Sequence, residues 1–68
     1  MRLSVVLPTF NEADNILPLL ERLERSLTGV AYEILVVDDD SPDGTAALVE
    51  AHAATHPAVR AVRRVAVR

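Results

Sequence analysis

The stretch "YEILVVDDDSPDGT", residues 32–45, joins an apolar run directly to three consecutive aspartates. Residues 32–37 are almost continuously apolar, which is typical of a buried strand in a parallel sheet. The acidic residues Asp38, Asp39 and Asp40 follow at its carboxyl end. Ligands of open α/β sheets bind beyond the carboxyl ends of the strands, so this stretch predicts both a central strand and a candidate site.

The preceding sequence predicts a first strand and a first helix. Residues 3–7 form a second apolar run. Apolar residues then recur at helical spacing, at Ile16, Leu20, Leu23 and Leu27. Pro18 is tolerated only in the first turn of a helix, so the helix is expected to begin near Asp14 or Asn15, either of which can cap it. Gly29 marks its end.

The following sequence predicts a second helix and a third strand. Ser41 and Pro42 are the N-cap and first-position pair of a helix start, which would put Asp43 in the first turn. The helix should include "TAALVEAHAA" and stop before Pro57, and "AVRAVRRVAV" predicts a less buried strand. The order β-α-β-α-β indicates right-handed crossovers and a doubly wound sheet.

Length and composition limit the class of protein. Sixty-eight residues make at most one domain with a small core, and the absence of cysteine excludes disulfides. The apolar runs are too short for a spanning helix or a signal peptide, so a cytoplasmic location is the default expectation. A three-stranded sheet has an uncovered apolar face and an unpaired edge. We therefore expect residues 1–68 to be the first part of a larger domain that does not fold stably alone.

Charge is divided unevenly along the chain. The net charge is −3, and all ten acidic residues lie at or before Glu50. Four arginines follow, at Arg60, Arg63, Arg64 and Arg68. An acidic balance argues against a nucleic-acid binder. Two interpretations of this charge distribution remain equally open. One is a solvated acidic surface with a basic edge strand, and the other is a site that binds both a cation and phosphates.

Glycine usage excludes the common phosphate-binding loops. Gly29 and Gly44 are the only glycines, so neither G-x-G-x-x-G nor G-x-x-x-x-G-K-[ST] is present. A bound nucleotide would need a divalent cation and arginines instead. In an extended segment Asp39 points away from Asp38 and Asp40, so one or two of these carboxylates can contact one ligand. The spacing of the aspartates does not decide whether the carboxylates contact a ligand or form local hydrogen bonds in a turn.

Two motifs in order resemble a known family. "SVVLPTFNEADNI" followed by "YEILVVDDDSPDGT" resembles the N-terminus of family 2 glycosyltransferases, and most of all the polyprenyl-phosphate (dolichyl-phosphate) mannose synthases. The match covers residues 3 to 50. It implies a Rossmann-like sheet of glycosyltransferase A type, of which residues 1–68 are the N-terminal nucleotide-sugar-binding part. It also implies inverting transfer of a hexose, mannose from GDP-mannose, to a polyprenyl phosphate at the cytosolic face of the membrane.

The resemblance also implies particular site residues. Pro8, Phe10 and Glu12 would line the nucleotide pocket, and Val37 and Asp39 would lie beside the base and ribose. Phe10 stands where many members have tyrosine, so ring packing is retained without a phenol hydroxyl. Glu12 has the alternative of being an ordinary first-turn carboxylate of the first helix.

The resemblance places the catalytic metal outside this chain. Asp38 and Asp40 spell a D-x-D, but the family's metal-binding D-x-D follows a later strand. Mg²⁺ or Mn²⁺ is therefore expected in the full-length protein, with its ligands, the general base and the acceptor-binding residues downstream. Within residues 1–68 the resemblance implies neither a catalytic residue nor a metal ligand.

Two further groups of residues have competing interpretations. His52 and His56 have the i, i+4 spacing of a metal pair, but no acid accompanies them in the sequence, so surface histidines are expected. Arg64 or Arg68 could approach the donor pyrophosphate, although a solvated strand is the preferred interpretation.

Three other classes of function remain as alternatives. A response-regulator receiver has a similar strand with an acidic pair for Mg²⁺, but it would leave residues 1–31 unexplained. Another family 2 transferase could use a UDP-sugar. A non-catalytic nucleotide-sugar-binding fragment is the third alternative.

Overall fold

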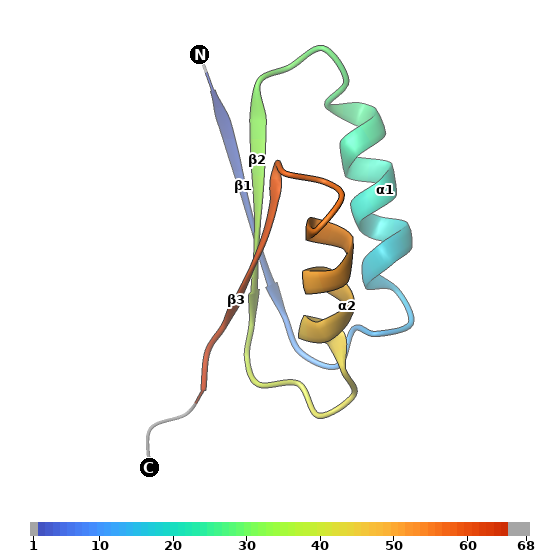
Figure 1. Cartoon of the computed structure of the whole chain (residues 1–68), viewed down its shortest axis with the longest axis vertical. Coiled ribbons are helices and arrows are strands. Elements are labelled where there is room, and N and C mark those ends of the chain that lie inside the picture. Colours follow the sequence, from blue (N-terminus) through green and yellow to red (C-terminus); the bar gives the residue numbers. More distant parts are fainter. Residues whose placement is uncertain (1, 66–68) are drawn as a thin grey trace.

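The computed structural model describes residues 2–65, which form one three-stranded parallel sheet with two helices (Figure 1). The elements follow in the order β1 (Leu3–Thr9), α1 (Ile16–Ser26), β2 (Tyr32–Asp38), α2 (Thr45–Ala53) and β3 (Val59–Arg63). β2 lies between β1 and β3 and pairs with both in parallel. The predicted β-α-β-α-β order is therefore confirmed.

Both helices pack on the same face of the sheet (Figure 1). The strand order β1-β2-β3 never reverses, so two right-handed crossovers place both helices on one side. The second helical layer of a doubly wound sheet is not found among residues 2–65. The core between sheet and helices consists of Ile16, Leu20, Ile34, Val36, Val49 and Val59.

The other face of the sheet is apolar and open. Val6 of β1 is 57% exposed and Val62 of β3 is 44% exposed. β1 is therefore covered on one face only, although its apolar run suggested a strand buried on both. The expected uncovered apolar face is confirmed.

The predicted start of α1 is confirmed. Asn15 occupies the N-cap position, although its side chain makes no capping hydrogen bond. The Glu12 carbonyl accepts hydrogen bonds from the N–H groups of Asn15 and Ile16, at 3.0 and 2.8 Å. Pro18 lies in the first turn, where its missing N–H costs no intrahelical bond.

The predicted start of α2 is wrong. Ser41 and Pro42 lie in a loop, and the helix begins at Thr45 after Gly44, whose φ is +87°. Asp43 precedes the helix, and its carboxylate accepts hydrogen bonds from the N–H and the hydroxyl of Thr45. Ser41 does not cap the helix, because its hydroxyl oxygen accepts from the Asn11 N–H while the hydroxyl itself donates to Asp38.

Neither α1 nor α2 combines the length and the apolar composition needed to cross a bilayer.

Candidate functional site

A cavity of about 260 Å³ lies at the carboxyl ends of β1 and β2. It is lined by Pro8, Thr9, Phe10, Val37, Asp39 and Arg64, and is called here the sheet-end cavity. Four of the five residues that the family resemblance assigned to the nucleotide pocket therefore line the same cavity. The fifth, Glu12, does not line it.

The alternation of side chains along the strands explains why these residues lie together. Pro8 and Val37 are register partners on β1 and β2. They alternate with the next pair, Thr9 and Asp38, which are buried under the helices. Because successive side chains point to opposite faces, Pro8 and Val37 face the uncovered side. Asp39, one residue beyond Asp38, turns to the same side, as the sequence predicted.

Asp38 has a structural role beneath the sheet-end cavity. It is 1% exposed, and its carboxylate accepts hydrogen bonds from the Thr9 hydroxyl at 2.8 Å, the Ser41 N–H at 2.8 Å and the Ser41 hydroxyl at 2.6 Å. Burial by itself disfavours the charged carboxylate, but these hydrogen bonds outweigh it and lower the pKa of Asp38. Asp38 is therefore an anion whose oxygens are already bound within the protein.

Three hydrogen bonds tie the loop after β1 to the loop after β2. The N–H of Asn11 donates to the Ser41 hydroxyl at 2.9 Å. The next two N–H groups, of residues 12 and 13, donate to the Thr45 hydroxyl at 3.0 Å and to the Asp43 carboxylate at 3.1 Å. The bond from the Thr45 hydroxyl is the main reason that the pKa of Asp43 is lowered. The two loops thus hold each other at the end of the sheet.

Glu12 lines a neighbouring cavity of about 220 Å³. The two cavities share Pro8 and Thr9 in their walls. The interpretation of Glu12 as a first-turn carboxylate is wrong, since the first turn of α1 contains no acidic residue. Its assignment to the nucleotide pocket stays a prediction. Its carbonyl, not its side chain, supports the start of the helix.

The structure adds Thr9 and Arg64 to the predicted set. Arg64 is exposed, as expected of a solvated strand, and it also lines the sheet-end cavity. Its N–H donates to the Asp38 carbonyl at 2.7 Å, which continues the pairing of β3 with β2 by one residue. Arg63 points elsewhere, and pairs with Glu50 of α2 at 2.7 Å. Arg68 lies outside the described residues.

The three aspartates at the carboxyl end of β2, residues 38–40, do not fit a cation site in their observed arrangement. Asp38 would have to give up its bonds to Thr9 and Ser41 to bind an ion. Asp39 faces the opposite side, and Asp40 is exposed with a φ of +55°. Within residues 2–65, the group that brings three ligand atoms together is a different one, Glu24 with His52 and His56.

The expectation that no acid accompanies the two histidines is wrong. They were expected on the surface without an acid, but Glu24 from α1 lies 2.6 Å from the Nε2 atom of His52. Both rings are partly buried. The partner comes from a different helix, so no local spacing in the sequence indicates it.

Comparison with known proteins agrees with the motifs. A profile described as glycosyl transferase family 2 matches residues 4–66. The chain is 44% identical over 64 residues to a dolichol-phosphate mannosyltransferase of Pyrococcus furiosus. The aligned residues make up 94% of this chain and 18% of that protein. It is 38% identical over 64 residues to an undecaprenyl-phosphate mannosyltransferase of Micrococcus luteus, covering 94% of this chain and 26% of the relative.

A third relative is the polyprenol monophosphomannose synthase of Mycolicibacterium smegmatis, 43% identical over 56 residues, or 82% of this chain and 20% of that protein. The chain thus spans between 18% and 26% of the length of these relatives. The receiver alternative is set aside, because the residues that it left unexplained form β1 and α1 and lie within the family match. This chain belongs to the family 2 glycosyltransferases.

Proposed function

We propose that the full-length protein transfers mannose from GDP-mannose to a polyprenyl phosphate, with inversion at the anomeric carbon. The relatives named above are mannosyltransferases or a phosphomannose synthase, and the name of each contains a polyprenyl phosphate or a polyprenol. The observation that carries the proposal within this chain is the sheet-end cavity, where Phe10, Asp39 and Arg64 meet in a member of this family.

The sheet-end cavity has the chemistry that a nucleoside diphosphate requires. The ring of Phe10 is 56% exposed and offers an apolar surface for the base. An ionised carboxylate only accepts hydrogen bonds, so Asp39 suits the ribose hydroxyls or the N–H groups of the base. The guanidinium of Arg64 suits the phosphates. Pro8 and Val37 complete an apolar wall.

The proposed reaction is a direct displacement. An oxygen of the acceptor phosphate attacks the anomeric carbon, and the bond from that carbon to the nucleoside diphosphate breaks. The nucleoside diphosphate leaves with the electron pair. Because the attacking phosphate oxygen is already negatively charged, it needs no strong base.

We also propose that the full-length protein requires Mg²⁺ or Mn²⁺, bound by residues outside this chain, since the described aspartates do not fit a cation site. Bound there, the ion would offset charge on the leaving diphosphate. A lipid acceptor implies peripheral association with the cytosolic face of the membrane.

The sugar has a second candidate. An undecaprenyl-phosphate 4-deoxy-4-formamido-L-arabinose transferase of Proteus mirabilis is 39% identical over 51 residues, which cover 72% of this chain and 16% of that protein. Its name contains a similar acceptor and a different sugar. A donor other than GDP-mannose, such as a UDP-sugar, is therefore the alternative to test.

The test is donor binding to the full-length protein by calorimetric titration, with Mn²⁺ present and absent. We expect GDP-mannose to bind more tightly than UDP-glucose. We expect Asp39→Ala to weaken binding by about tenfold, the effect of losing one hydrogen bond to a charged group. Asp40→Asn is the control, because asparagine tolerates the left-handed backbone there, and it should bind as the unchanged protein does. Equal affinities of the two variants would contradict the role of Asp39, and preference for UDP-glucose would contradict the donor.

A further inference from the structure

A second polar cluster joins α1 to α2. Glu24 belongs to α1, His52 to α2, and His56 to the turn that follows α2. One ligand atom from each of the three lies within 4.8 Å of those of the other two. The side chains of His52 and Glu24 are only 11% and 16% exposed. Because α1 runs back along the parallel strands, this cluster lies towards the opposite end of the sheet from the sheet-end cavity.

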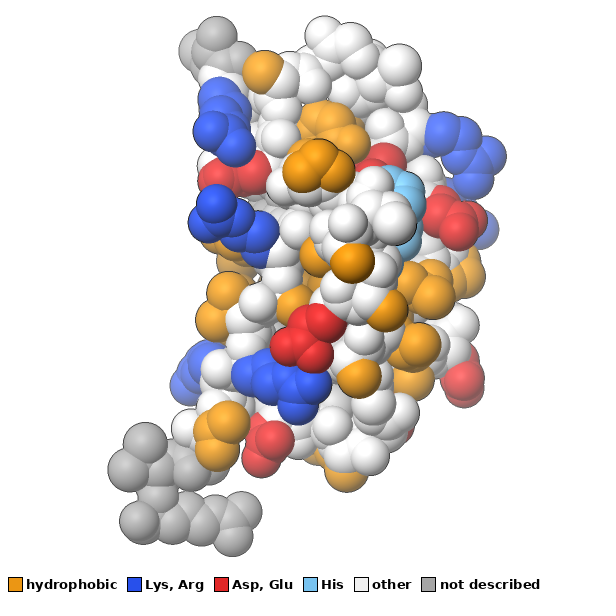
Figure 2. Space-filling model, in the orientation of Figure 1, with side chains coloured by type: hydrophobic (Ala, Val, Ile, Leu, Met, Phe, Trp, Pro, Cys, Tyr) orange, Lys and Arg blue, Asp and Glu red, His pale blue; other side chains and the backbone are white. Residues whose placement is uncertain are grey.

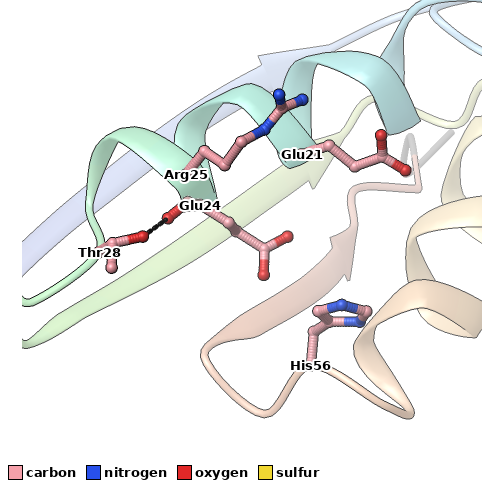
Figure 3. Close-up of a pocket in the computed structure, with 5 residues that line it drawn as sticks. All are labelled: Glu21, Glu24, Arg25, Thr28 and His56. Carbon is pink, nitrogen blue, oxygen red and sulfur yellow. Dashed lines mark hydrogen bonds between the residues drawn. The ribbon is translucent and has the colours of Figure 1, made fainter.

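The cluster borders a cavity of about 410 Å³, lined by Glu21, Glu24, Arg25, Thr28 and His56. Figure 3 shows the carboxylate of Glu24 pointing towards the ring of His56, whereas the guanidinium of Arg25 points away from it. The histidines reach the surface as a small patch beside acidic and basic side chains (pale blue in Figure 2). An ion from solvent can therefore reach the cluster.

Hydrogen bonds orient the ring of His56. Its Nδ1 lies 2.9 Å from the carbonyl oxygen of His52 and 2.9 Å from the Thr55 hydroxyl. In the tautomer whose Nδ1 donates to the carbonyl, Nε2 keeps its lone pair and can bind an ion. Metal-binding histidines are commonly oriented in this way, by donating the second ring N–H to a backbone carbonyl.

An ion pair alone does not account for the arrangement. It explains the contact of 2.6 Å between the Glu24 carboxylate and the Nε2 atom of His52. It does not explain why the His56 ring stacks on that of His52, with centroids 3.9 Å apart and an angle of 5° between the planes. The stack places the His56 ring beside this pair, so that three ligand atoms lie together.

We propose that Glu24, His52 and His56 bind a divalent metal ion of the zinc class and thereby join α1 to α2. Two imidazoles and one carboxylate are a ligand set that suits Zn²⁺, with water from the adjoining cavity in the fourth position. The ion takes the place of any proton held between Glu24 and His52, and that proton passes to solvent. Parallel rings cannot both direct a lone pair at one ion, so one ring turns out of the stack.

The site differs in kind from the Mg²⁺ or Mn²⁺ requirement proposed above. Those ions prefer oxygen ligands, whereas this cluster offers two nitrogens. The proposal does not rest on the transferase function, and its test does not use transferase activity.

The test uses the full-length protein, freed of metal with a chelator and titrated with Zn²⁺ in competition with a chromophoric indicator. We expect Glu24→Gln and His56→Gln each to weaken Zn²⁺ binding by about tenfold or more. Glu21→Gln is the matched control, because it is the same change on the same helix and in the wall of the same cavity. It should leave Zn²⁺ affinity unchanged.

A second measurement needs no variant. Co²⁺ bound to the unchanged protein should give the strong visible absorption of a four-coordinate ion with nitrogen ligands, and Zn²⁺ should abolish it. The proposal is overturned if the unchanged protein gives no such absorption. It is equally overturned if Glu24→Gln, His56→Gln and Glu21→Gln bind Zn²⁺ with the affinity of the unchanged protein.

Discussion

At the scale of single residues, Asp38 is the centre of the region under the sheet-end cavity. Its carboxylate accepts three hydrogen bonds and joins Thr9 of β1 to Ser41 of the following loop. Ser41 in turn accepts from the N–H of Asn11, so the loop after β1 depends on the same carboxylate. Because Asp38 is buried on the helix side of the sheet, the adjacent Asp39 faces the sheet-end cavity.

We expect Asp38→Asn to destabilise the full-length protein by about 1–3 kcal/mol, the cost of leaving buried hydrogen-bonding groups without suitable partners. An asparagine has one acceptor oxygen in place of two. Chemical denaturation followed by circular dichroism measures the change. Asp40→Asn is the control, because Asp40 is exposed and asparagine tolerates its left-handed backbone with a φ of +55°.

The Asp38→Asn variant should also change how the stability of the protein depends on pH. The folded-state pKa of Asp38 lies below its ordinary value of 3.8, so the unfolded chain binds more protons in acid. The stabilisation by Asp38 is thus complete above that value and is lost as pH falls through the lower, folded pKa. Asp38→Asn should reduce the loss of stability in acid. Equal stability and equal acid slopes in the two asparagine variants would contradict this role of Asp38.

At the scale of elements, the start of α2 depends on backbone conformation. Gly44 has a φ of +87°, and a Cβ atom there would meet nothing within 4 Å. Any cost of substitution is therefore backbone strain and not a clash. We expect Gly44→Ala to destabilise the full-length protein by about 1 kcal/mol, and Gly44→Asn by less, because asparagine visits the left-handed region more readily. A thermal unfolding midpoint for Gly44→Ala equal to that of the unchanged protein would contradict this assignment.

The sequence predicted the elements well where the signal was local. The apolar runs located β1 and β2 to within two residues of their observed ends, and Pro18 located the start of α1. The start of α2 was misplaced, because Ser41 binds Asp38 in place of capping the helix. The pairing of Glu24 with His52 joins two helices, and the presence of Arg64 in the sheet-end cavity depends on how β3 pairs. Those contacts arise from tertiary packing, which local patterns do not encode.

At the scale of the whole molecule, the open face of the sheet is the dominant feature. Val6 and Val62 are each more than 40% exposed, and β1 and β3 are both edge strands within residues 2–65. A chain of about 60 residues buries only about 60% of its unfolded surface even when it is compact. In residues 2–65 the open face of the sheet adds little to the surface that is buried on folding. The relatives are several times longer, which provides chain to cover this face.

We therefore expect the isolated 68-residue chain to show no cooperative thermal transition and to bind a hydrophobic dye such as ANS. The full-length protein should unfold cooperatively and bind little dye. Val6→Lys provides an independent check: a charge on a covered face should destabilise the full-length protein by several kcal/mol, since a buried charge without a partner is costly. A sharp calorimetric transition in the isolated chain would contradict the first expectation. Unchanged stability of the full-length Val6→Lys variant would show that this face stays open to water.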